Sequence, residues 1–406
     1  MLPLDQLSML RFGMSEVPEV GGAPGTYEER WSQWFLEQSF FRDFTYRNPR
    51  GRRKGEELAD AVVLFDDVAL LVQVKAQCGN HEPKAWATEA TLKALKQVKA
   101  THSNLVNGHI KKLKNDFYGE VDYNPTAFPN LYGIIVLAQD PAPFVVEDLV
   151  PEVKGAGFPI HVFSLNDFAL IASRFDTAAD FIQFLEFRTD IGPKVTMTVH
   201  QEIKNIGRMT PFVVETLAAH MSDTTPEQLH KTALAFVETA TGELIGSPDW
   251  RYGLAIDDMI ARAHDVDPNL TWNSPDHLAS LRISEYLGWL TRRRRIALGK
   301  KVVLQCEDAK NDGKDHWFTH CQKSRGTVAV YVVTNCVRSD RVKLLQVLGT
   351  YAHWKYGVRQ AFGVVTEPIG AGRSYDFMLT RGTIPPQVIE NLKSMDDPFA
   401  PGGDLL

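Results

Sequence analysis

The chain has 406 residues, 44% of them apolar, and a formal net charge of −6. This length is enough for two or three domains of about 150 residues each, and the apolar fraction excludes a disordered chain. No apolar stretch reaches the ~18 residues that a membrane-spanning helix needs, so we expect no membrane contact. Four scattered cysteines and the lack of a secretion-signal pattern indicate a reduced, cytoplasmic protein. The negative charge excludes a surface coated with DNA-binding charge, but it leaves open a local basic groove.

The first predicted element is a helix over Thr26–Gln38, which follows the GGAPG segment at 21–25. Thr26 can cap this helix, and Glu29, three residues later, completes a capping-box pattern. Aromatic residues recur at helical spacing and are expected to face a core. They are Trp31, Trp34 and Phe35. A short strand over 42–47 and a polar, basic loop over 48–55 follow.

Two β-rich stretches, Leu58–Phe65 and Val68–Ala76, flank an Asp66-Asp67 pair and predict a hairpin. If the two acids form the turn, residues equidistant from it pair across the strands. Phe65 then faces Val68, and counting back along both strands sets the register of the whole hairpin.

This register places Asp60 opposite Gln73. Side chains alternate along a strand, so Gln73 and Lys75 lie on the same face of the sheet. The hairpin therefore predicts that three polar side chains, Asp60, Gln73 and Lys75, converge on one patch of an otherwise apolar sheet.

After the hairpin, the pattern predicts one or two helices over 84–114 and buried strands at Leu131–Gln139 and Phe158–Leu165. A helical stretch with a break then runs to about Arg188. The order α-β-β-β-α-β, followed by β-α, is typical of a compact α/β domain, which we assign to residues 1–190.

The second half of the chain changes character twice. Residues 191–300 are predicted to be mainly helical, and residues 301–406 return to an α/β pattern. Within the latter, TVAVYVVTN predicts a strand, SDRVKLLQVLGTYAHWKYG a helix and AFGVVTEP a second strand. This is the pattern of a small β-α-β module.

The elements over 26–140, about a third of the chain, resemble the core of the PD-(D/E)xK nuclease superfamily. That core has a helix with a glutamate, a strand with Asp, a strand with (Asp/Glu)-x-Lys and a second helix. GTYEERWSQWF and NPRGRRKGEELADAVVLFDDVALLVQVKA are similar to the Mrr-like and Holliday-junction-resolvase-like branches. The resemblance implies an α/β fold with a restriction-endonuclease-like αβββαβ core, followed by the helical segment and the C-terminal module. Ala59 replaces the motif's proline, and Gln73 replaces its second acid, as in the Gln-x-Lys variant of Mrr-like members.

Matched residue by residue, the resemblance implies that Asp60, Gln73, Lys75 and Glu28 are catalytic. Asp60, Gln73 and Glu28 would hold Mg²⁺ or Mn²⁺, and Lys75 would polarise the attacking water or steady the developing charge. Glu28 is preferred to Glu29 because it shares a helical face with two of the aromatic residues. Glu29 is already assigned to the capping box.

The implied function is a Mg²⁺-dependent endonuclease that hydrolyses phosphodiester bonds, in DNA rather than RNA, and acts in antiviral defence. The missing acid leaves an alternative, a catalytically inactive nuclease-fold scaffold that binds nucleic acid or a protein partner. The sequence leaves a homo-oligomer open.

Several basic or amide residues are candidates for phosphate contacts, or else ordinary solvated surface. They are Arg52, Arg53 and Lys54 in the basic loop, and Lys93 and Gln97 on the following helix. The run Arg292–Arg295 either binds nucleic acid or an acidic partner, or places charge at a helix C-terminus.

Two further groups have weaker patterns. Cys306, His316, His320 and Cys321 contain an HxxxH spacing but no CxxC pair, so the pattern hardly supports zinc. Glu367, Arg373 and Asp376 line a ligand pocket or form ion pairs within a loop, and the second interpretation is preferred.

Overall fold

The computed structural model describes residues 25–47, 58–78, 82–115, 119–138, 150–190, 248–264, 275–322, 325–368 and 374–399, with the single residues 18 and 49. The chain divides into two compact units. One is Met1–Trp250 with Gly288–Arg293, and the other is Arg251–Leu287 with Arg294–Leu406. The predicted basic loop with Arg52, Arg53 and Lys54 lies outside the described residues. The predicted domain boundaries at 190 and 300 stay predictions.

A five-stranded mixed sheet forms the centre of the first unit, in the order β1-β2-β3-β6-β7. Its strands are β1 (Thr45–Arg47), β2 (Ala61–Phe65), β3 (Val68–Ala76), β6 (Asn130–Ala138) and β7 (Ile160–Ser164). β2 runs antiparallel to both β1 and β3, and β3, β6 and β7 run parallel to one another. The predicted α/β class is therefore confirmed.

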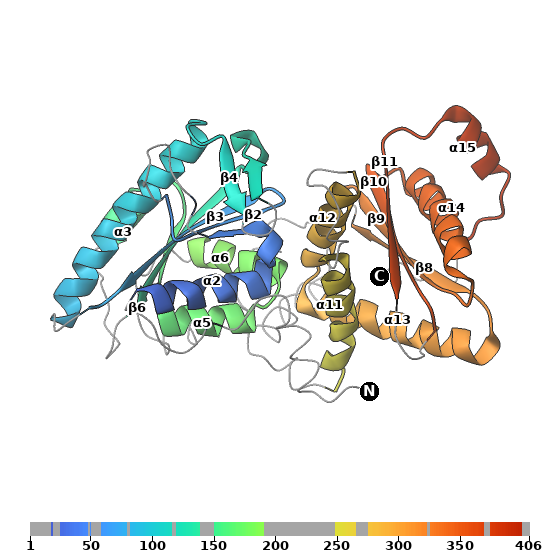
Figure 1. The fold of residues 1–406 in the computed structure, drawn as a ribbon, viewed down its shortest axis with the longest axis horizontal. Coiled ribbons are helices and arrows are strands. Elements are labelled where there is room, and N and C mark those ends of the chain that lie inside the picture. Colours follow the sequence, from blue (N-terminus) through green and yellow to red (C-terminus); the bar gives the residue numbers. More distant parts are fainter. Residues whose placement is uncertain are drawn as a thin grey trace. The chain divides into compact units, whose positions relative to one another are not determined.

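Helices cover both faces of this sheet (Figure 1). α3 (Pro83–Val106) lies on one face, and α2 (Thr26–Phe40), α5 (Leu165–Arg174) and α6 (Ala178–Asp190) lie on the other. Phe40 of α2 shows how the second face is held: its ring lies 5.8 Å from Phe65 of β2 and 5.4 Å from Phe181 of α6, centroid to centroid. The chain also forms η1 (Arg42–Phe44), β4 (Lys112–Asn115), β5 (Gly119–Asp122), η2 (Pro125–Ala127) and α4 (Val150–Lys154).

The end of α3 differs from the prediction. The helix ends at Val106, and Gly108 follows with a φ of 64°, a conformation that glycine adopts without steric cost. Residues 112–115 then form β4, paired antiparallel with β5. The predicted helical region over 84–114 was therefore too long, because helical composition continued past the residue that breaks the helix.

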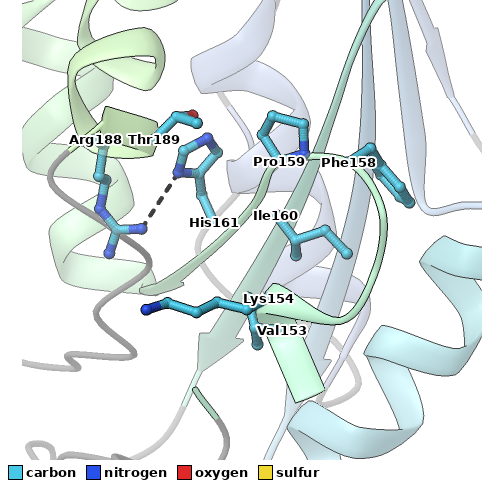
Figure 2. A pocket seen from close by; sticks show the side chains of 8 residues that line it. All are labelled: Val153, Lys154, Phe158, Pro159, Ile160, His161, Arg188 and Thr189. Atoms are coloured by element: carbon cyan, nitrogen blue, oxygen red, sulfur yellow. Dashed lines mark hydrogen bonds between the residues drawn. The ribbon is translucent and has the colours of Figure 1, made fainter. Parts of the chain in front are cut away.

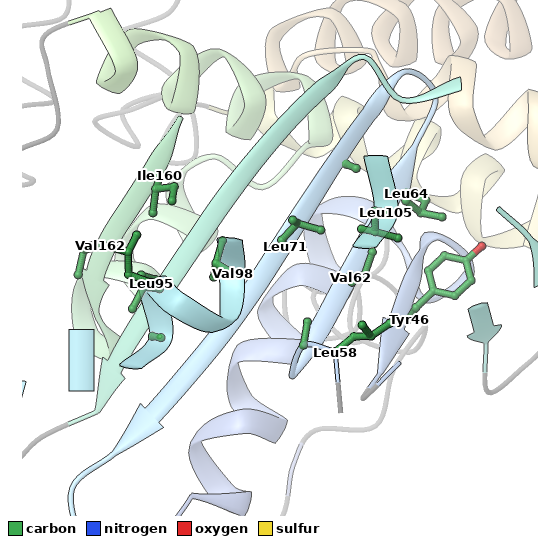
Figure 3. Close-up of a cluster of buried hydrophobic side chains, with 14 of the residues drawn as sticks. Tyr46, Leu58, Val62, Leu64, Leu71, Leu95, Val98, Leu105, Ile160 and Val162 are labelled. Carbon is green, nitrogen blue, oxygen red and sulfur yellow. The ribbon is translucent and has the colours of Figure 1, made fainter. Parts of the chain in front are cut away.

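The apolar core under α3 comes from alternate residues of the strands (Figure 3). Leu71 of β3, Val162 of β7 and Val98 of α3 all belong to this core. Gly133 of β6 lets the helix approach closely, because an added Cβ would lie 2.8 Å from Val98 Cγ1 and 3.0 Å from Ile160 Cγ1. This apolar cluster lies on the face of the sheet that α3 covers.

The second unit contains a four-stranded mixed sheet in the order β11-β10-β9-β8. Its strands are β8 (His316–Gln322), β9 (Thr327–Val333), β10 (Gln360–Thr366) and β11 (Tyr375–Arg381). Its helices include α11 (Trp250–His264), α12 (Pro275–Gly288), α13 (Arg292–Asp312), α14 (Arg338–Tyr356) and α15 (Pro386–Lys393), although Trp250, Gly288, Arg292 and Arg293 at the ends of three of them belong to the first unit. β9 and β10 are parallel and joined by α14, so the predicted β-α-β module is confirmed. No helix in the described part of the chain is long and apolar enough to cross a membrane.

The arginine run begins a helix instead of ending one. Arg292 is the first residue of α13, so the interpretation of charge at a helix C-terminus is wrong. Within the first unit, the Arg292 Nε lies 3.1 Å from Asp176 Oδ1, and both side chains are 1% exposed. Within the second, the Arg295 Nη1 lies 2.7 Å from Asp257 Oδ1. Arg292 and Arg295 are therefore buried structural residues, and neither is available to nucleic acid.

Candidate functional site

A two-residue turn at Asp66 and Asp67 sets the register of the β2–β3 hairpin. Phe65 pairs with Val68, and the pairing continues without a slip to the start of β2, so the predicted register is confirmed. Asp66 has a φ of 54°, in the left-handed region that aspartate tolerates better than most residues.

The same ladder extends to Asp60, which lies immediately before β2. The Asp60 N–H donates to the carbonyl of Val72 at 3.1 Å. On β3, Gln73 pairs with Ile135, a member of the apolar cluster under α3, so the Gln73 side chain lies on the α3 face of the sheet. Lys75, two residues later, shares that face.

The ammonium of Lys75 lies close to the side chains of both Gln73 and Asp60. Its Nζ lies 3.1 Å from Gln73 Oε1 and 3.7 Å from Asp60 Oδ2, and it donates to the carbonyl of Val74 at 2.9 Å. The Val74 N–H in turn donates to Asp60 Oδ2 at 2.5 Å. Asp60, Gln73 and Lys75 therefore converge, as the hairpin register predicts.

Burial makes the charge state of Asp60 depend on its neighbours. Asp60 is 6% exposed and Gln73 is 2% exposed. Burial raises the pKa of Asp60 above its usual range, while the Lys75 ammonium and the Val74 N–H oppose the increase. A positive charge beside Asp60 is thus what favours the carboxylate in this dry position.

The amide of Gln73 is held at both ends. Its Nε2 donates to the carbonyl of Leu58 at 3.2 Å, which leaves Oε1 to accept from Lys75. Thr101 of α3 also donates its hydroxyl to the Leu58 carbonyl. A carboxylate has no donor, so a glutamate could not make both of the contacts that Gln73 makes.

Gln97, a candidate for phosphate contacts, lies one turn before Thr101 on α3. Its Oε1 is buried without a hydrogen-bond partner among the described residues. Because Thr101 contacts the carbonyl that also binds Gln73, the face of α3 that carries Gln97 meets the site. Lys93, another turn earlier, is exposed. Their predicted role in phosphate binding stays a prediction.

Gln33 of α2 is a neighbour of the site that the sequence did not indicate. Its Nε2 donates to the backbone carbonyl of Asp60 at 2.8 Å, and its side chain is 5% exposed. Nothing local in the sequence predicts this contact, because it joins residues from separate elements. The sequence does place Gln33 four residues after Glu29, so both lie on one face of the helix. If Glu29 faces the site, Gln33 does so as well.

The N-cap of α2 is Gly25, and this changes which glutamate closes the capping box. The Glu28 Oε2 accepts from the Gly25 N–H at 2.7 Å and occupies the third position of the box. The prediction that Thr26 and Glu29 form the box was therefore wrong, and so was the argument that left Glu28 available. Glu29 lies about 40° from Gln33 around the helix axis, whereas Glu28 lies about 140° away. The geometry thus favours Glu29 as the helix glutamate nearer to Asp60.

The cysteine and histidine residues of the second unit do not assemble into a metal site. The His320 Nδ1 lies 2.5 Å from the Tyr286 hydroxyl, and the His316 Nε2 lies 3.0 Å from Asp312 Oδ2. Cys306 is buried in α13. Across the described ranges, no group of three or more His, Cys, Asp or Glu side chains could hold a metal ion.

Glu367 and Asp376 form ion pairs with arginines of α14. The Arg341 Nη1 lies 2.5 Å from Glu367 Oε2, and the Arg338 Nε lies 2.7 Å from Asp376 Oδ1. Arg373, the partner considered from the sequence, lies outside the described residues. The ion-pair interpretation holds for the two acids, with partners that come from the helix instead of the loop.

The oxygens at Asp60 and Gln73 fit a hard cation if substrate and water complete its shell. Asp60 supplies one carboxylate and Gln73 Oε1 supplies one amide oxygen. Mg²⁺ in proteins is commonly bound through one or two carboxylates, with its other ligands from water and substrate phosphates. The residues present meet the lower end of that requirement.

Comparison with known proteins adds no family to this description. No protein-family model matches the chain, and no curated protein has a matching sequence.

Proposed function

We propose that the first unit is a metal-dependent nuclease domain with a restriction-endonuclease-like core, which hydrolyses phosphodiester bonds of DNA. The observation that carries this proposal is the convergence of Asp60, Gln73 and Lys75 on one face of a hairpin. An element order of helix, three strands, helix and strand supports it, because α2, β1, β2, β3, α3 and β6 occur in that order.

Each side chain has a distinct task in this proposal. Asp60 and Gln73 hold Mg²⁺ or Mn²⁺ through their oxygens, and Glu29 or Glu28 contributes through a water. When bound, such a cation would neutralise charge on the phosphate and lower the pKa of a water. Lys75 holds the attacking water or the developing negative charge, since its ammonium is already directed at the oxygens of the site.

The proposal is tested by cleavage of plasmid and linear DNA with Mg²⁺ or Mn²⁺. Asp60→Asn keeps the size of the side chain and an acceptor for Val74 but removes the charge, and Lys75→Met removes the ammonium. We expect each variant to lose at least about a hundredfold in rate. Lys96→Ala, on the exposed side of α3, is the control and is expected to cleave normally. Unchanged cleavage in both site variants would place the activity elsewhere.

One observation favours a second function, an inactive scaffold that binds nucleic acid or a protein. The Lys75 ammonium already contacts oxygens of both Asp60 and Gln73, and a metal ion would have to share these oxygens with it. If the scaffold is correct, the wild type binds DNA in a gel-shift assay but cleaves none with any divalent cation, and Asp60→Asn binds as the wild type does. If the wild type cleaves DNA and Asp60→Asn does not, the nuclease proposal is supported and the scaffold is excluded.

A further inference from the structure

The second unit repeats the order of elements that carries the Asp60 site in the first. In the first unit, α2 and β1 precede the β2–β3 hairpin, and α3 then crosses over to β6, which runs parallel to β3. In the second unit, α13 precedes the β8–β9 hairpin, and α14 crosses over to β10, which runs parallel to β9. The neighbour order β2-β3-β6 therefore matches the order β8-β9-β10.

The correspondence ends at the next strand. β7 runs parallel to β6 and is reached through α4, beside a cavity of about 200 Å³ whose walls include Val153 and Ile160 from the core under α3 (Figure 2). β11 instead runs antiparallel to β10. The comparison of the two units is therefore confined to the hairpin, the crossover helix and the strand that follows this helix.

An acid occupies the same register position in both hairpins. Asp60 comes immediately before β2, and Asp315 comes immediately before β8. The pairing at the open end of each hairpin places Asp60 opposite Gln73 and Asp315 opposite Thr334. The two acids are therefore counterparts by strand register.

The residues opposite the acids lie on the face of the sheet that the crossover helix covers. On β9, alternate residues belong to the core under α14, and these are Val328, Val330 and Val332. Because side chains alternate along a strand, Thr334 continues this row on the α14 face. Gln73 lies in the same way on the α3 face of β3.

The contacts of Asp315 parallel those of Asp60. The Thr334 hydroxyl donates to Asp315 Oδ1 at 2.6 Å, and Cys336 Sγ lies 3.9 Å from Asp315 Oδ2. In the first unit, Lys75 Nζ lies 3.7 Å from Asp60 Oδ2. In both units, the acid is thus contacted by the residue two places beyond the one opposite it. At this position the second unit has a thiol where the first has an ammonium.

The nearest guanidinium of the crossover helix does not replace this ammonium. Arg341 Nε donates to the carbonyl of Cys336 at 2.8 Å, and Arg341 Nη1 pairs with Glu367. Among the described residues, the Asp315 carboxylate contacts only the hydroxyl of Thr334 and the thiol of Cys336, and no basic side chain pairs with it.

We propose that the second unit is a degenerate counterpart of the first unit's candidate nuclease core, in which Asp315 keeps the acid of the site and Cys336 stands in place of its lysine. The role of that lysine rests on the proposed function, whereas the repeated order of elements and the register do not. Without the ammonium, the Asp315 site lacks the group that would hold the attacking water or steady the developing charge on a phosphate. Cleavage by the chain then comes from the Asp60 site alone.

The first test restores the missing ammonium with Cys336→Lys and asks whether it reaches Asp315. Cys336 is half-buried, so a longer side chain can extend along the surface. In a double-mutant cycle with Asp315→Asn, measured by urea unfolding, we expect a coupling of about threefold in the unfolding equilibrium constant, as for a partly exposed ion pair. The control Val337→Lys adds the same charge at an exposed neighbouring residue and should show no such coupling. If Cys336→Lys shows none either, the proposal is overturned whether or not the protein is a nuclease.

The second test is cleavage of plasmid DNA with Mn²⁺ in the Asp60→Asn background, where the first site is silent. We expect Cys336→Lys to raise the rate at least about tenfold over Asp60→Asn alone, and the added Asp315→Asn to abolish this gain. If the wild type cleaves but Cys336→Lys restores nothing, the second site is not a degenerate nuclease site and the proposal is overturned. If the wild type itself cleaves nothing, the proposed function fails, and the coupling between positions 336 and 315 decides whether the site is repeated.

Discussion

The amide of Gln73 is best tested by converting it to an acid. Gln73→Glu restores the carboxylate that the nuclease motif has at this position, but it removes the hydrogen bond from Nε2 to the carbonyl of Leu58. It also buries a carboxylate at a position that is 2% exposed, with one oxygen facing that carbonyl oxygen. The Leu58 carbonyl keeps the Thr101 hydroxyl as a partner, so the main cost is the buried and partly opposed negative charge.

Lys75 offsets part of this cost, because its ammonium lies 3.1 Å from the oxygen of the present side chain. We expect a net loss of about 2 kcal/mol in the free energy of unfolding at neutral pH, without divalent cations. Burial raises the pKa of the introduced carboxyl, and once protonated it donates to Leu58 as the amide does. The stability difference from the wild type is therefore present above this pKa and is lost as the pH falls through it.

Urea unfolding at pH 7 and pH 5 measures both parts of this prediction. Gln387→Glu on α15 is the matched control, because it makes the same chemical change at an exposed residue and should stay within about 0.5 kcal/mol of the wild type. A Gln73→Glu protein as stable as the wild type at pH 7 would refute the argument that the amide is selected by its two contacts. A stability loss that grows as the pH falls would refute it as well.

Three further predictions concern other residues of the first unit. Burial raises the pKa of Asp60, so Mn²⁺ binding measured by electron paramagnetic resonance should weaken as the pH falls, beginning above the usual range of an aspartate. Binding that persists unchanged down to pH 4 would contradict this. Gly133→Val should destabilise the unit by about 1–3 kcal/mol in urea unfolding, since even a Cβ would lie 2.8 Å from Val98 Cγ1; an unchanged midpoint would show that α3 can move away. Burial raises the pKa of Asp180 to about 6. The stability that its protonated form contributes is therefore complete below the usual aspartate pKa and is lost as the pH rises through about 6. Asp180→Asn keeps an acceptor for the Arg292 N–H and should remove up to about 3 kcal/mol of this pH dependence. The measurement is the free energy of unfolding of the wild type and of the variant against pH. Parallel curves for the two proteins would contradict the prediction, because they would show that Asp180 does not titrate in this range.

The hairpin and its polar residues were predictable because their geometry is local. A two-residue turn fixes the register from Phe65 and Val68 outward, and alternation then fixes which side chains share a face. The β-α-β module of the second unit was predictable for the same reason, since each of its elements has its own apolar pattern. Neither depends on how distant parts of the chain meet.

The surroundings of the site were not predictable because they depend on contacts between elements. Gln33 and Thr101 reach backbone carbonyls of Asp60 and Leu58 from helices on either side, across 27 and 43 residues of sequence. A shift of one residue in the N-cap, from Thr26 to Gly25, exchanged the expected roles of Glu28 and Glu29. Capping patterns with several adjacent candidates determine a helix start only to within a residue, and a helix face changes by about 100° with each residue.

The substitution of an amide for an acid changes the charge of the site and not only its ligand set. Among the three converging side chains, the ionised Asp60 and the Lys75 ammonium together carry no net charge, whereas an acid at position 73 would add one negative charge to attract a cation. Without this added charge the site attracts Mg²⁺ less strongly on its own, and a bound phosphodiester supplies further negative charge. In the proposed nuclease, cation and nucleic acid therefore bind together, each raising the affinity for the other by the same factor. Under this proposal, the amide at position 73 would make metal binding depend on substrate more strongly than a second carboxylate would.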